Sequence, residues 1–229
     1  MSEPRRALYL GRFQILHKGH LSVLKYIDAQ PDVDELVIGI GSTQYSRNNK
    51  SFEKPLILNP FTFEERKEYV EATVKNNLMK PYMIVGIMDQ HNYARWAAYT
   101  LSITPKISYI YTNGRGEIDV FTKLGYECRN FPTPLHYNAT LIRELMANEG
   151  PWERFIPDEA VVVIKNRGLD KIVRQLYDQH KDEVEQTHQN RIRLHEISYE
   201  DFLVAEGLKS EELKTNILGV KDVGNEVLR

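Results

Sequence analysis

The feature that most constrains the fold is a regular alternation of short apolar runs with longer segments of helical periodicity. The apolar runs cover residues 7–10, 34–42, 82–89, 107–113 and 126–132. Apolar residues at helical spacing follow each run, in 19–29, 62–76, 93–103, 117–125 and 139–150. Runs that are apolar without alternation are typical of strands covered on both faces. This order therefore predicts a parallel sheet with helices on both sides.

We expect an α/β fold with a Rossmann-like, doubly wound parallel sheet over residues 1–168. Residues 169–229 are charged and helical in character, with few strand signals, so we expect a helical C-terminal extension of unknown role. Ligands of such sheets bind at the carboxyl ends of the strands. Polar motifs that directly follow the predicted strands are therefore the first candidates for a site.

Composition removes several classes of function. The 229 residues carry 30 Lys and Arg against 32 Asp and Glu, so the strongly basic surface typical of nucleic-acid binding is absent from the overall balance. The one cysteine, Cys128, cannot form an internal disulfide. No apolar run is long enough to span a bilayer. We expect a cytoplasmic protein that binds neither nucleic acid nor membrane.

The stretch GRFQILHKGH, residues 11–20, lies between the first predicted strand and helix. Gly11 and Gly19 allow sharp bends and close approach of a ligand. His17 and His20 lie one helical turn apart, and Arg12 and Lys18 add positive charge. Helix N-termini bind phosphate, and imidazoles donate hydrogen bonds to phosphate oxygens and can carry charge near neutral pH. The stretch therefore predicts a polyphosphate site.

The same stretch resembles the HxGH signature of the nucleotidyltransferases, and with its GRFQ start it looks most like the archaeal-type nicotinamide-nucleotide adenylyltransferases. Four further segments are similar to that family in order and spacing: GIGSTQ (39–44), NPFTFEERKE (59–68), MDQHNYARW (88–96) and YNATLIRELM (137–146). The likeness covers about residues 5–165. Several ordered matches are far more specific than one motif.

The resemblance implies transfer of AMP from ATP to nicotinamide mononucleotide (NMN), giving NAD and pyrophosphate, with Mg²⁺ held mainly by the ATP phosphates and no metal site on the protein. Its catalytic residues would be His17, His20 and Arg143. Its ATP-binding residues would be Gly11, Arg12, Phe13, Gln14, Gly19, Asn138 and Thr140. Its nicotinamide-nucleotide residues would be Ser42, Asp89, Asn92, Tyr93 and Trp96. The family often forms homo-oligomers.

Some positions depart from the family pattern, and alternatives stay open. Ile15 replaces a proline, Asn138-Ala139 replaces Ser-Gly, and Glu144 replaces the second arginine of a pair. One alternative is a sibling enzyme that uses nicotinic acid mononucleotide, FMN or pantetheine phosphate as acceptor; another is a nucleotide-binding regulator with weakened catalysis. Individually, Trp96 could fill the core, Asp89 could cap a helix and Arg143 could lie on a helix surface.

Overall fold

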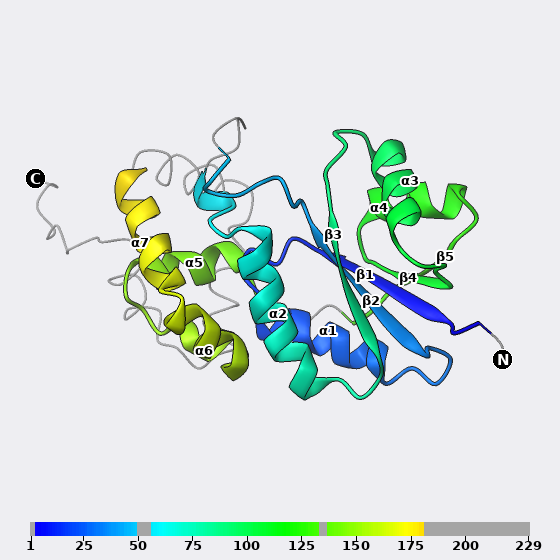
Figure 1. Ribbon diagram of the computed structural model, residues 1–229, viewed down its shortest axis with the longest axis horizontal. Helices are drawn as coiled ribbons and strands as arrows, with labels where there is room; N and C mark the ends of the chain where they lie inside the picture. Colours follow the sequence, from blue (N-terminus) through cyan, green and yellow to red (C-terminus); the bar gives the residue numbers. More distant parts are fainter. Residues whose placement is uncertain (1–2, 50–55, 133–136, 181–229) are drawn as a thin grey trace, which may run out of the picture.

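A parallel five-stranded sheet forms the centre of the computed structural model, which describes residues 3–49, 56–132 and 137–180 (Figure 1). The strands are β1 (Arg6–Gly11), β2 (Glu35–Gly41), β3 (Tyr82–Ile87), β4 (Tyr109–Tyr111) and β5 (Glu127–Arg129). Their order is β3-β2-β1-β4-β5, and every neighbouring pair is parallel. The predicted doubly wound α/β sheet is confirmed.

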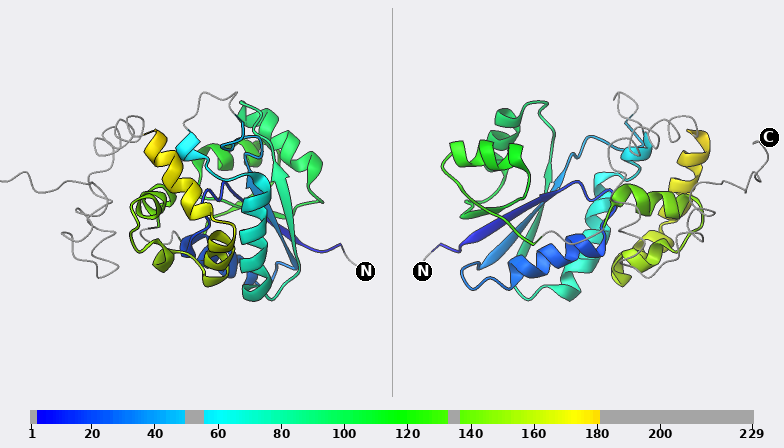
Figure 2. Two further views of the ribbon diagram at one scale, coloured as in Figure 1. Left: turned by 60° about the vertical axis from the view of Figure 1, so that its left-hand side comes forward. Right: turned by 180° about the vertical axis from the view of Figure 1, so that it is seen from behind.

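Helices cover both faces, as the apolar runs predicted. The first four are α1 (Lys18–Asp28), α2 (Phe63–Asn77), α3 (Tyr93–Ile103) and α4 (Arg115–Lys123). Helices α1 and α2 lie on one face, and α3 and α4 lie on the other (Figures 1 and 2). The buried side chains accordingly form two clusters, one that includes α1 and α2 and a smaller one that includes α3 and α4.

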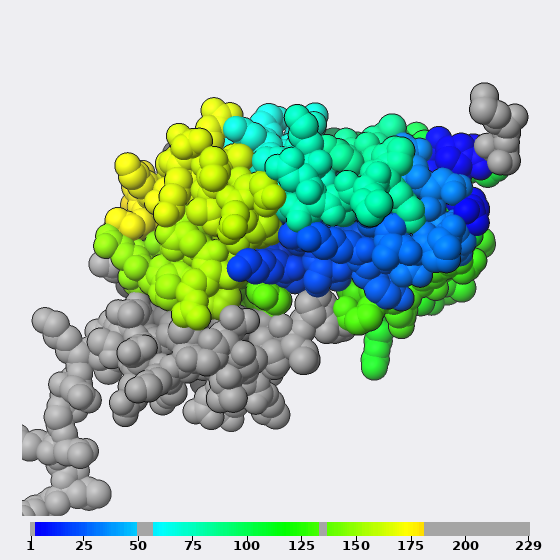
Figure 3. Space-filling view, turned by 90° about the horizontal axis from the view of Figure 1, so that it is seen from below, coloured from blue at the N-terminus to red at the C-terminus, as the bar shows by residue number. Residues whose placement is uncertain are grey.

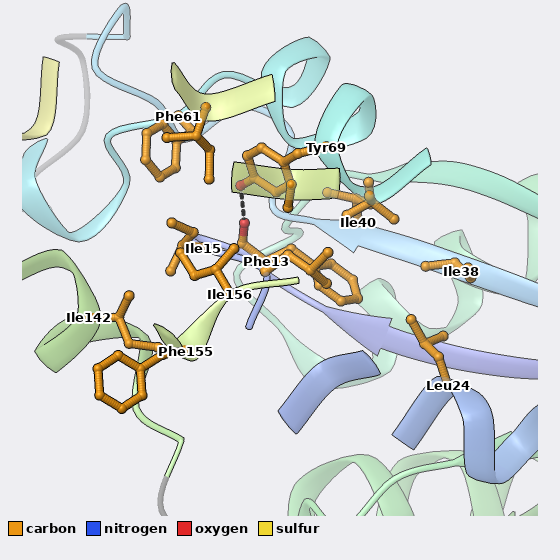
Figure 4. Close-up of a cluster of buried hydrophobic side chains, with 14 of the residues drawn as sticks. Phe13, Ile15, Leu24, Ile38, Ile40, Phe61, Tyr69, Ile142, Phe155 and Ile156 are labelled. Carbon is orange, nitrogen blue, oxygen red and sulfur yellow. Dashed lines mark hydrogen bonds between the residues drawn. The ribbon is translucent and has the colours of Figure 1, made fainter. Parts of the chain in front are cut away.

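The remaining helices extend the molecule beyond the carboxyl ends of the strands, on the side of α2 (Figures 1 and 3). They are α5 (Ala139–Ala147), α6 (Asp158–Asn166) and α7 (Leu169–Gln179), with short 3₁₀ helices η1 (Leu56–Leu58) and η2 (Trp152–Phe155). Their apolar residues Ile142, Phe155 and Ile156 join the main core with Phe13 and Tyr69 (Figure 4).

Packing continues without a break across residue 168, where the sequence suggested that an extension begins. Helix α7 buries Leu169, Val173, Leu176 and Tyr177 in the same cluster as α1 and α2. The described part of the extension, up to residue 180, therefore belongs to the main core. Residues 181–229 lie outside the described residues.

Candidate active site

A pocket of about 370 Å³ opens at the carboxyl edge of the sheet. Its lining comes from the ends of three strands and from the first turns of two helices. Seven of the predicted site residues line it: Gly11, Arg12, Ser42, Asp89, Asn92, Tyr93 and Trp96. The remaining lining residues are Leu10, Gly41, Ile87, His91 and Glu117. The pocket thus brings together residues that are up to 107 positions apart, from Leu10 to Glu117.

Asp89 is held at the end of β3 by a side-chain clamp. The Gln44 amide donates to the Asp89 carbonyl at 2.8 Å and accepts from the Asp89 N–H at 3.0 Å. One Asp89 carboxylate oxygen accepts the His91 N–H at 2.8 Å, across a turn in which His91 has a φ of 54°. Helix α3 is capped instead by Asn92, whose side chain accepts the Arg95 N–H at 3.0 Å. Asp89 therefore lines the pocket and does not cap α3.

Two aromatic residues of α3 form one wall of the pocket. Trp96 is half-buried, and its ring packs edge-on against the buried Phe121 of α4 at 5.6 Å between centroids. Tyr93 is 63% exposed and lies 6.3 Å from Trp96. A side chain at Gly116 would meet the Tyr93 ring at 3.0 Å, so the ring packs directly on the backbone of α4. Trp96 both contacts the smaller core and faces the pocket.

Sequence reasoning missed Glu117, which lies in the first turn of α4 and lines the pocket. The Thr112 hydroxyl donates to its carboxylate, and the Thr112 oxygen also accepts the Gly114 N–H at 3.0 Å. After burial, the Glu117 charge is the second cause that raises the pKa of Tyr9. The segment TNGRGE was not among the motifs that carried the resemblance, so only the fold reveals this carboxylate.

His17 and His20 together form the N-terminal cap of α1. The Nδ1 atom of His17 accepts the His20 N–H at 3.2 Å, and the Nδ1 atom of His20 accepts the His17 N–H at 3.3 Å. The two rings stack at 3.7 Å, and Tyr137 stacks on His17 from the other side. Because each Nδ1 accepts a hydrogen bond, the proton of each neutral ring is assigned to Nε2. Both rings are thus prepared as Nε2–H donors.

Burial keeps both rings uncharged. It lowers the pKa of His20 to about 4, and burial with the neighbouring His20 lowers the pKa of His17 well below its usual range. In the folded chain, desolvation penalises the protonated form and so works against the charge near neutral pH that imidazoles can carry. What remains is the capacity of two neutral imidazoles to donate hydrogen bonds.

Side chains of α2 and α5 donate hydrogen bonds to three successive carbonyl groups of the loop between β1 and α1, those of Arg12, Phe13 and Gln14. Arg66 of α2 donates to the Arg12 carbonyl at 2.8 Å and to the Gly41 and Ser42 carbonyls. The Tyr69 hydroxyl donates to the Phe13 carbonyl (Figure 4). Arg143 of α5 donates to the Gln14 carbonyl. Two helices that are distant in sequence therefore fix this loop.

Arg143 is 1% exposed and does not line the pocket. Besides the Gln14 carbonyl it contacts the Ile57 carbonyl at 3.1 Å and the Thr140 hydroxyl at 3.2 Å. It is therefore neither the surface arginine of the alternative interpretation nor, in this conformation, open to the pocket. To reach a phosphate group, its guanidinium would have to leave these oxygens.

Four other predicted ATP residues have clear structural tasks. The Phe13 ring is buried, its backbone φ is 48°, and it fills the space where a side chain at Gly11 would lie, at 2.8 Å. The buried Gln14 amide is paired on both sides with the backbone of Phe61, at 3.0 Å each. A side chain at Gly19 would meet His17 at 2.9 Å and Tyr137 at 3.0 Å. The space at both glycines is therefore used by the chain itself.

Asn138 caps α5. Neither Asn138 nor Thr140 lines the pocket. The Asn138 side-chain oxygen accepts the N–H groups of Thr140 at 2.9 Å and of Leu141 at 3.4 Å. In the part of the chain that the structure describes, no group of three or more His, Cys, Asp or Glu side chains is arranged to hold a metal ion. Within the same residues, no helix has both the length and the apolar character needed to cross a membrane.

The sequence of the chain is similar to those of known proteins. The cytidylyltransferase-like family model matches residues 8–216. The nicotinamide-nucleotide adenylyltransferase of Thermoplasma acidophilum is 35% identical over 176 residues, which is 76% of this chain and 93% of that protein. The one of Thermococcus onnurineus is 34% identical over 173 residues, 74% of this chain and 87% of that protein.

Among solved structures, the chain is similar to a bifunctional NMN adenylyltransferase/ADP ribose pyrophosphatase from Francisella tularensis, crystallised with AMP and a manganese ion. The TM-score is 0.61 at 19% identity, over 82% of this chain. The match spans 56% of that bifunctional chain. At this identity the likeness supports the fold alone.

Proposed function

Since the chain belongs to the cytidylyltransferase-like family and, within it, to the nicotinamide-nucleotide adenylyltransferases, we propose that it transfers AMP from ATP to NMN and releases NAD and pyrophosphate. The observation that carries the proposal is the pocket at the carboxyl edge of the sheet. It contains every residue expected for the nicotinamide nucleotide, together with Gly11 and Arg12 of the loop expected to bind ATP. A site of this size at a strand edge suits a nucleotide.

The acceptor mononucleotide would occupy the wall formed by α3. Trp96 offers a ring face for stacking on the pyridine, and such stacking contributes about 1 kcal/mol beyond burial. Asp89, which lines the pocket, would accept a hydrogen bond from the carboxamide or the ribose. Ser42, Asn92 and Tyr93 complete the polar lining.

ATP would lie over the loop between β1 and α1. The backbone N–H groups of Lys18 and Gly19, at the start of α1, and the Nε2–H groups of His17 and His20 would contact its phosphate oxygens, and Arg12 would add positive charge. We assign Phe13, Gln14 and Arg143 an indirect part, because they hold the loop in place. Gly19 also has an indirect part, because it leaves the space that His17 and Tyr137 occupy. Asn138 and Thr140, in the segment YNATLIRELM, are proposed to contact ATP through the Asn138 side-chain amide and the Thr140 hydroxyl, whose oxygen also accepts a hydrogen bond from Arg143 at 3.2 Å.

The chemistry needs alignment more than acid–base help. An oxygen of the NMN phosphate, already ionised, attacks the α-phosphorus of ATP; the bond from that phosphorus to the β-bridging oxygen breaks, and pyrophosphate leaves with the electron pair. Positioning and stabilisation of charge on the phosphate oxygens are the protein's tasks. Mg²⁺, held mainly by the ATP phosphates, would neutralise the leaving pyrophosphate.

A cytoplasmic location, small-molecule nucleotides rather than nucleic acid or membrane as partners, and the homo-oligomeric assembly often found in the family also belong to this proposal. They follow from the composition and the resemblance. Size-exclusion chromatography with light scattering measures the oligomeric state directly.

The proposal is tested with the purified full-length protein, ATP, Mg²⁺ and NMN, by following NAD with a coupled dehydrogenase and pyrophosphate with a phosphatase-coupled assay. His20→Ala should lower kcat/KM by about 100-fold, the loss typical of one transition-state donor. Trp96→Ala should raise the KM for NMN about tenfold, whereas Trp96→Phe, which keeps an aromatic ring, should have a KM close to that of the wild type. His180→Ala, at the far end of α7, is the matched control and should change neither value.

Release of pyrophosphate only with nicotinic acid mononucleotide, FMN or pantetheine phosphate would keep the reaction type and reject NMN as the acceptor. Tight binding of ATP or NAD, measured by calorimetry, without turnover of any acceptor would support the regulator instead.

A further inference from the structure

We propose that Glu117 makes the site select acceptor mononucleotides whose base carries an uncharged carboxamide over those whose base carries a carboxylate. The inference rests on the proposed function and names the acceptor more closely. It concerns a residue that lies outside the motifs that carried the resemblance. Its grounds are the position of Glu117, the fixed direction of its side chain and the charges that share the pocket.

Glu117 lies on the side of α4 that faces the aromatic wall. Phe121, one helical turn further along α4, packs against Trp96 at 5.6 Å between ring centroids. Residues four apart share one face of a helix, so Glu117 and Phe121 point to the same side. Gly116, the preceding residue, receives the Tyr93 ring at a distance of 3.0 Å from its Cβ position. Glu117 is thus adjacent to the place where α3 and α4 meet around Trp96.

The carboxylate is held in place by its own neighbours. Thr112 donates its hydroxyl proton to one carboxylate oxygen, and the Thr112 oxygen is in turn fixed by the Gly114 N–H at 3.0 Å. A side chain at Gly114 would meet the Glu117 carboxyl group at 3.2 Å. A half-buried charge fixed in this way acts on a ligand more strongly than a mobile surface charge, because less solvent screens it.

The charges of the pocket discriminate between the two bases. Among the described residues that line the pocket, Asp89 and Glu117 contribute two carboxylates, and Arg12 is the one Arg or Lys. The ribosylated pyridine ring is a cation in both mononucleotides, and both carboxylates attract it. Nicotinic acid mononucleotide adds a third carboxylate to this group, and like charges at close range repel. The carboxamide of NMN avoids that repulsion and can donate hydrogen bonds to either side chain.

The test measures kcat/KM for NMN and for nicotinic acid mononucleotide at saturating ATP and Mg²⁺, in wild type and in two variants of Glu117. Glu117→Gln removes the charge and keeps an oxygen for the Thr112 hydroxyl. It should lower the preference for NMN about tenfold, mainly through a lower KM for the acid. Glu117→Lys should lower the preference further, because it adds attraction for the carboxylate.

Asp119→Asn is the matched control, because Asp119 lies two residues further on the same helix, is exposed and pairs with Lys123 at 2.8 Å. It should leave the preference unchanged. Thermal unfolding of each variant shows whether it folds, and equilibrium binding of the two mononucleotides gives the same ratio without turnover.

Three results would overturn the inference: a wild-type preference for the acid, a preference in Glu117→Gln within twofold of wild type, or an equal change in Asp119→Asn. With NAD formation intact, any of them leaves the proposed function standing. Absence of product from either acceptor contradicts the proposed function instead, and the binding ratio still decides the role of Glu117.

Discussion

At the scale of single residues, the histidine pair has a structural and a chemical task at once. Each imidazole accepts a backbone N–H through Nδ1, and the stacked rings close the N-terminus of α1. Both rings are buried in this arrangement, and their burial opposes protonation of the imidazoles. The same arrangement that completes the cap therefore supplies two neutral donors whose charge does not change near pH 7.

This burial predicts a specific pH dependence of stability. The pKa of His20 is about 4 in the folded chain and about 6.5 when unfolded, so the unfolded chain binds more protons between these values. The free energy of unfolding should fall as the pH drops from 6.5 to 4, and His20 should account for about 3 kcal/mol of the loss. Urea unfolding at a series of pH values should give a shallower slope for His20→Gln. His180→Gln should keep the wild-type slope; an unchanged slope in His20→Gln would contradict the account.

At the scale of elements, the loop between β1 and α1 depends on α2 and α5 for its shape. Phe13 has a positive φ, which costs a residue with a side chain about 1–3 kcal/mol. Its carbonyl is held by the Tyr69 hydroxyl, and the carbonyls on either side are held by Arg66 and Arg143. The buried donors thus maintain a backbone that would otherwise relax.

Tyr69→Phe tests this support with the ring left in place. The variant should lose about 1–2 kcal/mol of stability, since the Phe13 carbonyl loses its partner. It should also lose about fivefold in kcat/KM, because the loop that carries the histidines is less well fixed. Denaturant unfolding and the coupled NAD assay measure the two effects. Tyr26→Phe, on the outer side of α1, is the control; equal behaviour of the two variants would contradict the account.

The strands and helices could be predicted because buried strands appear as short continuous apolar runs, whereas helices carry apolar residues at helical spacing. Helical periodicity predicted helices over 19–29 and 62–76, and the structure has α1 from Lys18 and α2 from Phe63, with a capping box of Thr62 and Glu65 before α2. The side of a helix on which an arginine is buried depends on tertiary packing, so the inward position of Arg143 could not be predicted. Glu117 was missed for the same reason, because nothing local distinguishes it from a solvated helix carboxylate.

At the scale of the whole molecule, the described chain is built around two clusters on the two faces of the sheet, and the pocket lies where elements of both meet. The smaller cluster supplies the support for Trp96, and the main one supports the loop with the histidines. Helix α7 belongs to the main cluster. The sequence analysis predicted a domain boundary at residue 168, before α7, because charged residues dominate the exposed side of this helix.

Val173→Asp in the full-length chain tests whether α7 is part of the core. Val173 is fully buried, so a carboxylate there should cost at least about 3 kcal/mol and lower the temperature of unfolding of the whole protein. Lys171→Asp places the same side chain on the exposed surface of α7 and should have little effect. Calorimetry that showed an unchanged main transition in Val173→Asp would mean that α7 is a separate unit.

The central claim, that an NMN phosphate oxygen attacks the α-phosphorus of ATP, is tested most directly with NMN labelled with ¹⁸O in its phosphate group. Mass spectrometry of the products after one turnover locates the label. The account predicts NAD that retains all of the label and unlabelled pyrophosphate, formed in equal amounts. Label in the released pyrophosphate, or products other than NAD and pyrophosphate, would contradict it.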